Sequence, residues 1–269
     1  MKWAEYDAAF RRWGAVAQVE TVDEMKVAGR TYPLMRAQTD GAHDLLVTAG
    51  FHGDETAGPL TLLAHLPDLV ARARRCRVGL TIFPCVNPSG FEVRTRYNEA
   101  QEAPNNDFLR YEVVQGQTKA WVDQLPHGQS ACLGWRPFLE GPAETQAMAR
   151  QLAALPTPRA MLDLHQDPWL AKTGCYAYVF GDRDPFRTLL TRSDDVLPLA
   201  RDAEVDDDLF SDAEALIELH DGSITDLFWR RGTPWVATLE TTTVSPAPAC
   251  SRVNMIWLEG FIDLAARRL

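Results

Sequence analysis

Residues 45–55 read LLVTAGFHGDE, and this segment gives the clearest indication of the class of fold. Residues 45–51 are almost continuously apolar, which is typical of a strand buried on both faces of a sheet. Glycine and charged residues follow at once. Residues 59–66 (PLTLLAHL) then have helical composition, with the proline in the first turn, where it is tolerated. The order strand, loop, helix predicts one unit of an α/β fold.

The same pattern recurs along the chain. Strands are predicted at residues 78–86, 160–164, 176–180 and 235–239, and amphipathic helices at residues 144–155 and 253–269. Two alternating segments between Gln18 and Gln38 flank a glycine and predict a hairpin. We therefore expect a single α/β domain over residues 1–269, with three αβα layers around a mixed, mostly parallel central sheet.

Three segments lack clear periodicity. Residues 97–103 and 114–133 predict irregular loops, and the acidic residues 202–208 predict a solvated loop. These segments border the rim where parallel strands end, so we expect the least regular structure there.

Charge and composition restrict the partners and the location. The formal net charge is −10 and the pI is about 5.1, so no basic surface is available for nucleic acid or an anionic membrane. A peptide or small molecule is the expected partner, and the oligomeric state is not indicated. Five scattered cysteines predict reduced thiols. Acidic residues near the N-terminus and the lack of a long apolar run predict a cytoplasmic location.

Four chemically reactive residues follow predicted strands. His52 and Glu55 come after the first buried strand, His165 follows residues 160–164, and Glu240 follows residues 235–239. Because the carboxyl ends of parallel strands meet at one rim, we expect these side chains to lie close together.

Two imidazoles and one carboxylate suit a single catalytic zinc ion, which typically takes three protein ligands and a water. His52, Glu55 and His165 fit that set, and Glu240 is the candidate base that accepts a proton from the water. Each residue taken singly also fits a structural role, as a polar loop residue, a core histidine or a surface glutamate. Their occurrence together, beside several glycines, favours the metal site.

Further motifs accompany these four residues: VNPSGF at residues 86–91, Arg96-x-Asn98, and GSITD at residues 222–226. The whole arrangement, from about Leu45 to Glu240, resembles the zinc carboxypeptidases, to which succinylglutamate desuccinylase and aspartoacylase are related. The resemblance implies that His52, Glu55 and His165 bind zinc and that Glu240 activates the water. It also implies that Arg96 polarises the scissile carbonyl and stabilises its oxyanion.

The resemblance implies two further roles near residue 107. Asp107 would accept a hydrogen bond from the first histidine ligand, and Arg110 would bind a substrate carboxylate. The family's Asp-x-Asn-Arg motif stands here as Asp107-Phe108-Leu109-Arg110, so Leu109 replaces the asparagine. Asn98, Asn105 or Asn106 could supply the missing donor.

The substrate pocket is less clearly indicated. Ile217 stands where a substrate-covering tyrosine is expected, and Tyr176 and Tyr178 are possible substitutes, although alternate strand residues also suit ordinary packing. Ile224 or Thr225 falls at the position that sets side-chain preference in digestive relatives. Asp221 and Asp226 could attract a cation, but a turn residue and a helix cap are the simpler roles for them.

The implied function is a zinc-dependent hydrolase of an amide bond next to a free carboxylate. A metallocarboxypeptidase acting on peptides or cell-wall peptides fits best. The deacylases generally carry a further β-rich domain after the base, whereas the residues that follow Glu240 here are enough for only one helix. An N-acyl amino acid deacylase of the desuccinylase and aspartoacylase type is the first alternative. A non-catalytic metal-binding protein is the second.

Overall fold

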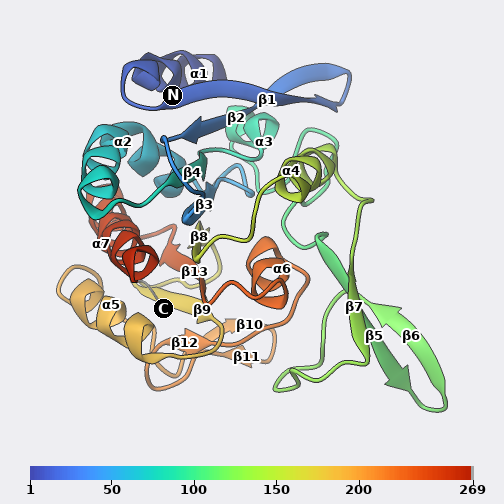
Figure 1. Ribbon diagram of the computed structural model, residues 1–269. Coiled ribbons are helices and arrows are strands. Elements are labelled where there is room, and N and C mark those ends of the chain that lie inside the picture. The colour runs from blue at the N-terminus through green and yellow to red at the C-terminus, as the bar shows by residue number, and fades with distance from the viewer. Residues whose placement is uncertain (268–269) are drawn as a thin grey trace.

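In the computed structural model, which describes residues 1–267, an eight-stranded sheet crosses the molecule (Figure 1). In spatial order its strands are β1 (Gln18–Val27), β2 (Arg30–Gln38), β4 (Leu80–Phe83), β3 (Leu45–Ala49), β8 (Ala160–Asp167), β13 (Trp235–Thr242), β9 (Cys175–Val179) and β12 (Leu216–Ile217). The four central strands, β4, β3, β8 and β13, are parallel. The β1–β2, β2–β4 and β13–β9 pairs are antiparallel. The predicted mixed, mostly parallel sheet is confirmed.

Helices cover both faces of this sheet (Figure 1). On one face lie α2 (Ala57–Cys76), α5 (Asp184–Asp194) and α7 (Ala247–Ala266), and on the other lie α4 (Ala143–Ala153) and α6 (Ile224–Arg230). Every residue of β3, β4 and β8 is buried, which explains the nearly continuous apolar sequences of β3 and β4. The remaining helices, α1 (Trp3–Arg11), a 3-10 turn (Arg12–Ala15) and α3 (Pro88–Val93), lie near the N-terminal hairpin.

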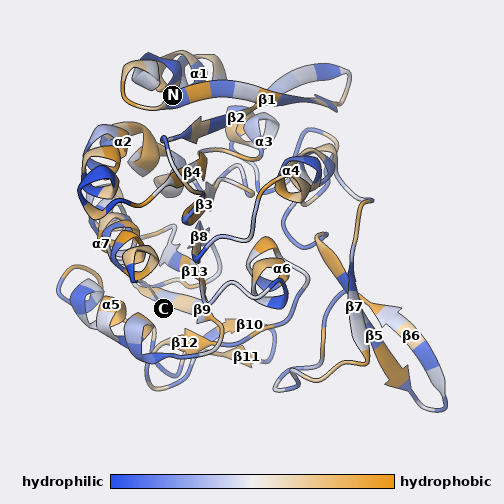
Figure 2. Ribbon diagram, in the orientation of Figure 1, coloured by the Kyte–Doolittle hydropathy of each residue, from blue (hydrophilic) through white to orange (hydrophobic). Residues whose placement is uncertain are grey.

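The long helices are amphipathic, as the mixed colours of α2 and α7 in Figure 2 show. In α2, Leu62, Leu66, Leu69 and Ala73 recur at helical spacing and are buried. The predicted helix at residues 253–269 begins earlier, at Ala247, and residues 268–269 lie outside the described residues. No helix among residues 1–267 is long and apolar enough to cross a membrane, and all five cysteines are free.

The prediction of an irregular loop over residues 114–133 holds for residues 123–133, which form no helix or strand, but is wrong for residues 114–122. A three-stranded antiparallel sheet, β5 (Leu109–Gln115), β6 (Thr118–Val122) and β7 (Gly134–Pro137), projects from the body as an arm (Figure 1). Gly116, with φ +65°, lies in the tight turn between β5 and β6. Most side chains of β6 and β7 are at least partly exposed, so their sequences lack the apolar alternation of a half-buried strand.

The acidic segment 202–208 is also more ordered than expected. It forms a short hairpin from β10 (Glu204–Asp206) and β11 (Leu209–Phe210). Val205 is buried and anchors the hairpin, while the acidic side chains at residues 204 and 206–208 are exposed, as predicted for a solvated segment. Residues 97–103 form no helix or strand, which agrees with the prediction.

Strands β8 and β13 are longer than predicted. His165 and Glu240 therefore lie within the strands rather than after them, and they are register partners in the parallel pair. The next strand, β3, pairs with the other edge of β8 and leads directly to His52. Three adjacent strands thus deliver the reactive side chains to one rim.

Candidate metal centre and active site

His52, Glu55 and His165 form a compact, buried cluster. Nδ1 of His52 lies 2.7 Å from Oε1 of Glu55, and Nδ1 of His165 lies 2.9 Å from Oε2 of the same carboxylate. One ligand atom from each residue can be chosen so that all lie within 4.8 Å of one another. This His-Glu-His cluster is typical of a zinc site with three protein ligands.

The loop that carries His52 and Glu55 is held by close backbone packing. A Cβ added at Gly53 would lie 1.9 Å from the carbonyl carbon of Gly90 in α3, so only glycine fits there. Asn87 caps α3 by accepting a hydrogen bond from the Gly90 amide at 2.8 Å, and its Nδ2 donates to the Phe51 carbonyl at 3.2 Å. The VNPSGF segment therefore fixes the loop that presents His52.

His165 is oriented by a carboxylate that the sequence analysis did not single out. Nε2 of His165 lies 2.9 Å from Oδ2 of Asp163, and Thr48 donates to Oδ1 of Asp163 at 2.7 Å. The other ring nitrogen, Nδ1, is thereby directed at Glu55. Burial lowers the pKa of His165, but the Asp163 and Glu55 carboxylates outweigh it and raise the pKa well above its usual value. The only signal in the sequence is an Asp-x-His pair in a buried strand.

The expected hydrogen bond from His52 to Asp107 is not present among residues 1–267. Nδ1 of His52 faces Glu55, and Asp107 accepts a hydrogen bond from Nη2 of Arg110 at 2.7 Å instead. Arg110 also stacks on the ring of Phe138, with its guanidinium carbon 3.7 Å from the ring centroid. Both residues belong to the base of the projecting arm, which explains why neither points toward the metal cluster.

A cavity of about 150 Å³ opens beside the cluster. Its walls include both histidines together with Arg96, Glu240, Tyr178 and Thr225. Asn105, Asn106, Asp221 and Ser223, which the sequence had already drawn attention to, line it as well. The remaining lining residues, for which no site role was predicted, are Phe180, Asp206, Leu219 and Thr238. Asp206 reaches the cavity from the short β10–β11 hairpin, a contact that no local pattern could have indicated.

Arg96 and Glu240 bring a guanidinium and a carboxyl group to this cavity. Nη1 of Arg96 donates to Oε1 of Glu55 at 2.8 Å, and the Arg96 side chain is 30% exposed. Oε2 of Glu240 is buried and has no hydrogen-bond partner among the described residues. Burial raises the pKa of the Glu240 carboxyl well above its usual value, and its neighbour His165 partly offsets this effect. A carboxyl group in this position is suited to exchanging protons with a bound molecule.

Four residues expected to contact substrate lie outside the cavity lining. Arg110 is held by Asp107 on the arm. The Asn98 amide donates to Glu102 and Glu144, the Tyr176 hydroxyl donates to Asp167 at 2.9 Å, and Ile224 is buried in the core. These four side chains therefore make structural contacts within the protein. Four other residues expected to contact substrate do line the cavity: Tyr178, Thr225, Asn105 and Asn106.

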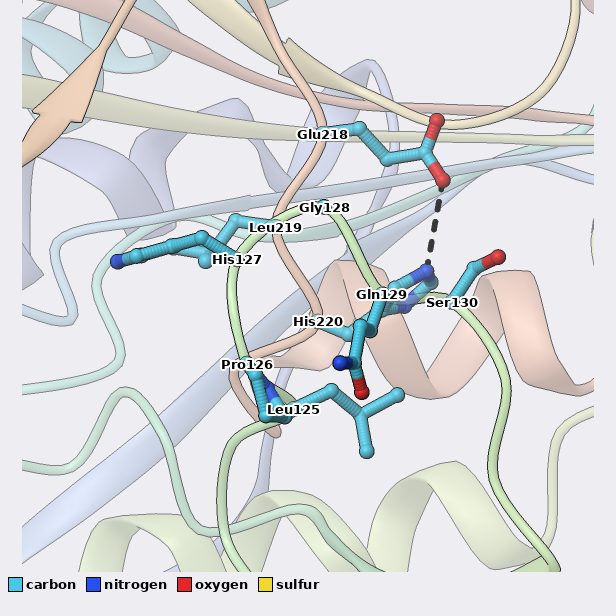
Figure 3. Close-up of a pocket in the computed structure, with 9 residues that line it drawn as sticks. All are labelled: Leu125, Pro126, His127, Gly128, Gln129, Ser130, Glu218, Leu219 and His220. Carbon is cyan, nitrogen blue, oxygen red and sulfur yellow. Dashed lines mark ion pairs between the residues drawn. The ribbon is translucent and has the colours of Figure 1, made fainter.

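A second cavity, of about 190 Å³, shares the lining residue Leu219 with the first, and Figure 3 shows the residues that line it. Residues 125–130 line it on one side and residues 218–220 on the other, and Leu219 lines both cavities. Nε2 of His220 lies 3.5 Å from Glu218 in this cavity. The segment 218–221 is therefore a thin partition between the two spaces.

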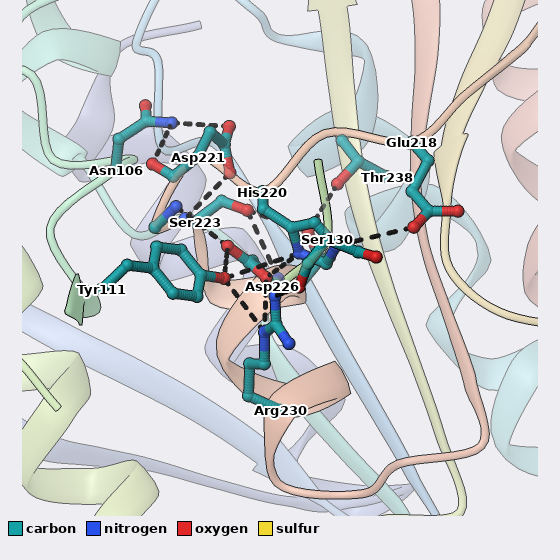
Figure 4. A network of polar contacts seen from close by, with 12 residues as sticks. Asn106, Tyr111, Ser130, Glu218, His220, Asp221, Ser223, Asp226, Arg230 and Thr238 are labelled. Atoms are coloured by element: carbon teal, nitrogen blue, oxygen red, sulfur yellow. Dashed lines mark hydrogen bonds and ion pairs between the residues drawn. The ribbon is translucent and has the colours of Figure 1, made fainter. Parts of the chain in front are cut away.

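The partition is held by a buried polar network (Figure 4). Nδ1 of His220 lies 2.8 Å from Oδ1 of Asp226, and the hydroxyl of Tyr111 donates to the other oxygen of that carboxylate. Arg230 donates to the Tyr111 hydroxyl at 3.2 Å. Ser223, and not Asp226, is the N-cap of α6. Asp226 lies in the first turn, accepts a hydrogen bond from the Gly222 amide at 3.1 Å and ties α6 to β5 through Tyr111.

Comparisons with known proteins agree with this geometry. Residues 42–121 match the family model "Succinylglutamate desuccinylase/Aspartoacylase catalytic domain". No curated protein sequence gives a significant match.

Solved structures match over nearly the whole chain. A candidate metallopeptidase from Shewanella amazonensis SB2B shares 23% identity over 97% of this chain and 91% of its own, with a TM-score of 0.70. A candidate metallopeptidase from Shewanella denitrificans OS217 shares 21% identity over 98% and 90% of the two chains, with a TM-score of 0.71. A metallo-carboxypeptidase from Pseudomonas aeruginosa, solved with (2-guanidinoethylmercapto)succinic acid, shares 15% identity over 98% of this chain and 69% of its own, with a TM-score of 0.58. Residues 42–121 are therefore similar to the catalytic domain of succinylglutamate desuccinylase and aspartoacylase, and the chain as a whole has the fold of these metallopeptidases and metallo-carboxypeptidases.

Proposed function

We propose that this protein is a zinc-dependent hydrolase that cleaves an amide bond next to a free carboxylate, acting as a metallocarboxypeptidase on peptides such as cell-wall peptides. One observation carries the proposal. The His52, Glu55 and His165 cluster shares its cavity with an acid, Glu240, whose Oε2 has no partner among residues 1–267. A buried acid without a partner is costly to the fold, so it indicates a functional role.

The donor set fits zinc. Nδ1 of His52, a Glu55 oxygen and Nδ1 of His165 would hold one ion per chain, and Asp163 keeps the His165 ring in the required orientation. When bound, zinc supplies the Lewis acidity that polarises a carbonyl group and makes water acidic.

The other residues of the cavity would supply proton transfer and charge stabilisation. Glu240 accepts a proton from the attacking water and passes it to the leaving amine. Arg96, whose guanidinium lies beside Glu55, donates to the carbonyl oxygen as negative charge develops there. Both interactions strengthen toward the transition state, so they act on kcat more than on substrate binding.

The free carboxylate of the substrate needs donors other than Arg110. Asn105 and Asn106 line the cavity, and Arg96 is the only Arg or Lys that does so among residues 1–267. Nδ2 of Asn106 also donates to Asp221, so it contributes to this wall already. We assign the carboxylate to this side of the cavity.

An N-acyl amino acid deacylase is the second candidate, and the family match over residues 42–121 favours it. A metal-binding protein without catalysis is the third, but it gives no use for the unpartnered Glu240 oxygen.

The test combines metal analysis with a substrate panel of N-acyl dipeptides, their C-amidated forms and N-acyl amino acids. We expect one zinc per chain. We also expect hydrolysis of the N-acyl dipeptides that have a free carboxylate, and this activity should be lost with a chelator and restored by zinc. Preferential cleavage of N-acyl amino acids would favour the deacylase. Bound zinc without hydrolysis of any substrate would leave only the non-catalytic role.

A further inference from the structure

A buried histidine outside the proposed active site has one ring nitrogen that the fold leaves unused. The side chain of His220 is only 3% exposed, and its Nδ1 lies 2.8 Å from Oδ1 of Asp226. Its Nε2 is buried and has no hydrogen-bond partner in the part of the chain that the structure describes. In the second cavity this nitrogen faces Glu218 (Figure 3). Because a buried polar atom without a partner is unfavourable, Nε2 indicates a binding site.

The network behind His220 determines the chemistry of this nitrogen (Figure 4). The Asp226 carboxylate also accepts hydrogen bonds from the Tyr111 hydroxyl and, at 3.1 Å, from the Gly222 amide. It is therefore an acceptor toward His220 as well, so Nδ1 carries the proton and the neutral ring presents the lone pair of Nε2 to the cavity. A carboxylate that holds one ring nitrogen in this way is the usual partner of a metal-binding histidine.

Glu218 places an oxygen at a distance that suits a shared metal ion. Its Oε1 lies 3.5 Å from Nε2 of His220. A direct hydrogen bond between a charged imidazole and a carboxylate is normally about 2.7 to 2.9 Å long. Two ligands that each lie about 2.1 Å from one zinc ion, in tetrahedral geometry, are about 3.4 Å apart. The observed separation therefore fits two ligands of one metal ion better than it fits an ion pair.

We propose that the second cavity binds a divalent transition-metal ion, such as zinc, through Nε2 of His220 and the carboxylate of Glu218, with water in the remaining positions. One imidazole and one carboxylate suit this class of ion, whereas magnesium and calcium prefer oxygen ligands alone. The cavity of about 190 Å³ has room for the ion and its waters, and the Glu218 side chain, which is 50% exposed, gives access from solvent.

This site is separate from the proposed catalytic zinc and does not depend on hydrolysis. With two protein ligands instead of three, it should bind more weakly than the cluster of His52, Glu55 and His165. It therefore fills only when zinc is added beyond the first equivalent.

The test titrates protein that already holds one zinc per chain with further zinc, and calorimetry and equilibrium dialysis count the ions bound. We expect a second, weaker equivalent in the wild type that added magnesium does not displace. For His220→Gln and for Glu218→Gln we expect the affinity for this equivalent to fall about tenfold or more, with the first equivalent retained. Glu218 is half exposed, so Glu218→Gln tests the site even if the buried His220→Gln fails to fold.

His65→Gln is the matched control, because His65 is an exposed histidine on α2 whose Nδ1 lies 3.7 Å from Oδ2 of Asp68. It should bind the second equivalent as the wild type does. Saturation of the wild type at one zinc, an unchanged second equivalent in Glu218→Gln, or an equal loss in His65→Gln would overturn the proposal. Anomalous scattering at the zinc edge, from crystals soaked in zinc, should show a peak between Glu218 and His220. A second peak only at another position would equally reject this site.

Discussion

Glu240 is the residue whose proposed role has the sharpest consequence. Glu240→Gln keeps the size and the neutral hydrogen-bonding capacity of the side chain but removes its ability to accept a proton. We expect zinc content to be unchanged and kcat to fall by about 10³-fold, within the range for loss of a general base. Metal analysis and steady-state kinetics on one preparation check both parts. Glu24→Gln, on the exposed surface of β1, is the control and should behave as wild type. Normal turnover by Glu240→Gln would mean that another group accepts the proton.

Asp163 contacts His165, so any effect that it has on the proposed metal is exerted through the His165 ring. Its carboxylate accepts from Thr48 and lies 2.9 Å from Nε2 of His165, so Asp163→Asn removes the charge that fixes the ring while keeping the volume. We expect zinc affinity to fall about 10- to 100-fold, the usual effect of losing such a partner. Competition with a chelator of known affinity measures this change directly. An affinity within threefold of wild type would show that strand packing alone orients His165.

At the scale of elements, the contact between the His52 loop and α3 predicts a steric effect. Gly53→Ala would place a Cβ atom 1.9 Å from the Gly90 carbonyl carbon. The backbone of the His52 loop and that of α3 could then not both keep their present positions. We expect a loss of about 3 kcal/mol in the free energy of unfolding, with weaker zinc binding because His52 moves. Denaturant titration and metal analysis follow the two effects. Gly14→Ala is the control, since no atom lies within 4 Å of a Cβ placed there. Equal stability of the two variants would contradict the packing argument.

The arm formed by β5, β6 and β7 gives a second prediction, which reverses the expectation for Arg110. Because Arg110 pairs with Asp107 and stacks on Phe138, outside the cavity lining, Arg110→Ala should leave KM for dipeptides with a free carboxylate within about twofold of wild type. Kinetics on free and amidated dipeptides test this. A tenfold rise in KM for the free acids alone would show that Arg110 turns into the cavity when substrate binds.

At the scale of the whole molecule, the sequence was informative where burial is complete. The apolar strand at residues 45–49 and the buried strands β8 and β13 fix the order of the central sheet. That order alone brings His52, His165 and Glu240 to one rim. The arm and the β10–β11 hairpin were missed because their strands are short and mostly exposed, so their sequences carry little periodicity. Asp206 lines the cavity because the β10–β11 hairpin packs beside it, and no local sequence pattern indicates such a tertiary contact.

The proposed metal centre should also contribute to the stability of the whole fold. It joins the loop after β3 to the central strand β8, and its three ligands are buried. If zinc binds only the folded state, a free zinc concentration of about 1,000 times the dissociation constant adds about 4 kcal/mol to the free energy of unfolding. For a chain of this size the corresponding shift in Tm is about 8 to 16 °C. We therefore expect chelation to lower Tm by that amount and added zinc to restore it. Glu55→Gln, which weakens the metal set, should show a much smaller chelator-dependent shift. Equal shifts in the variant and the wild type would place the stabilising ion elsewhere, and the absence of any shift would mean that folding and metal binding at this rim are independent.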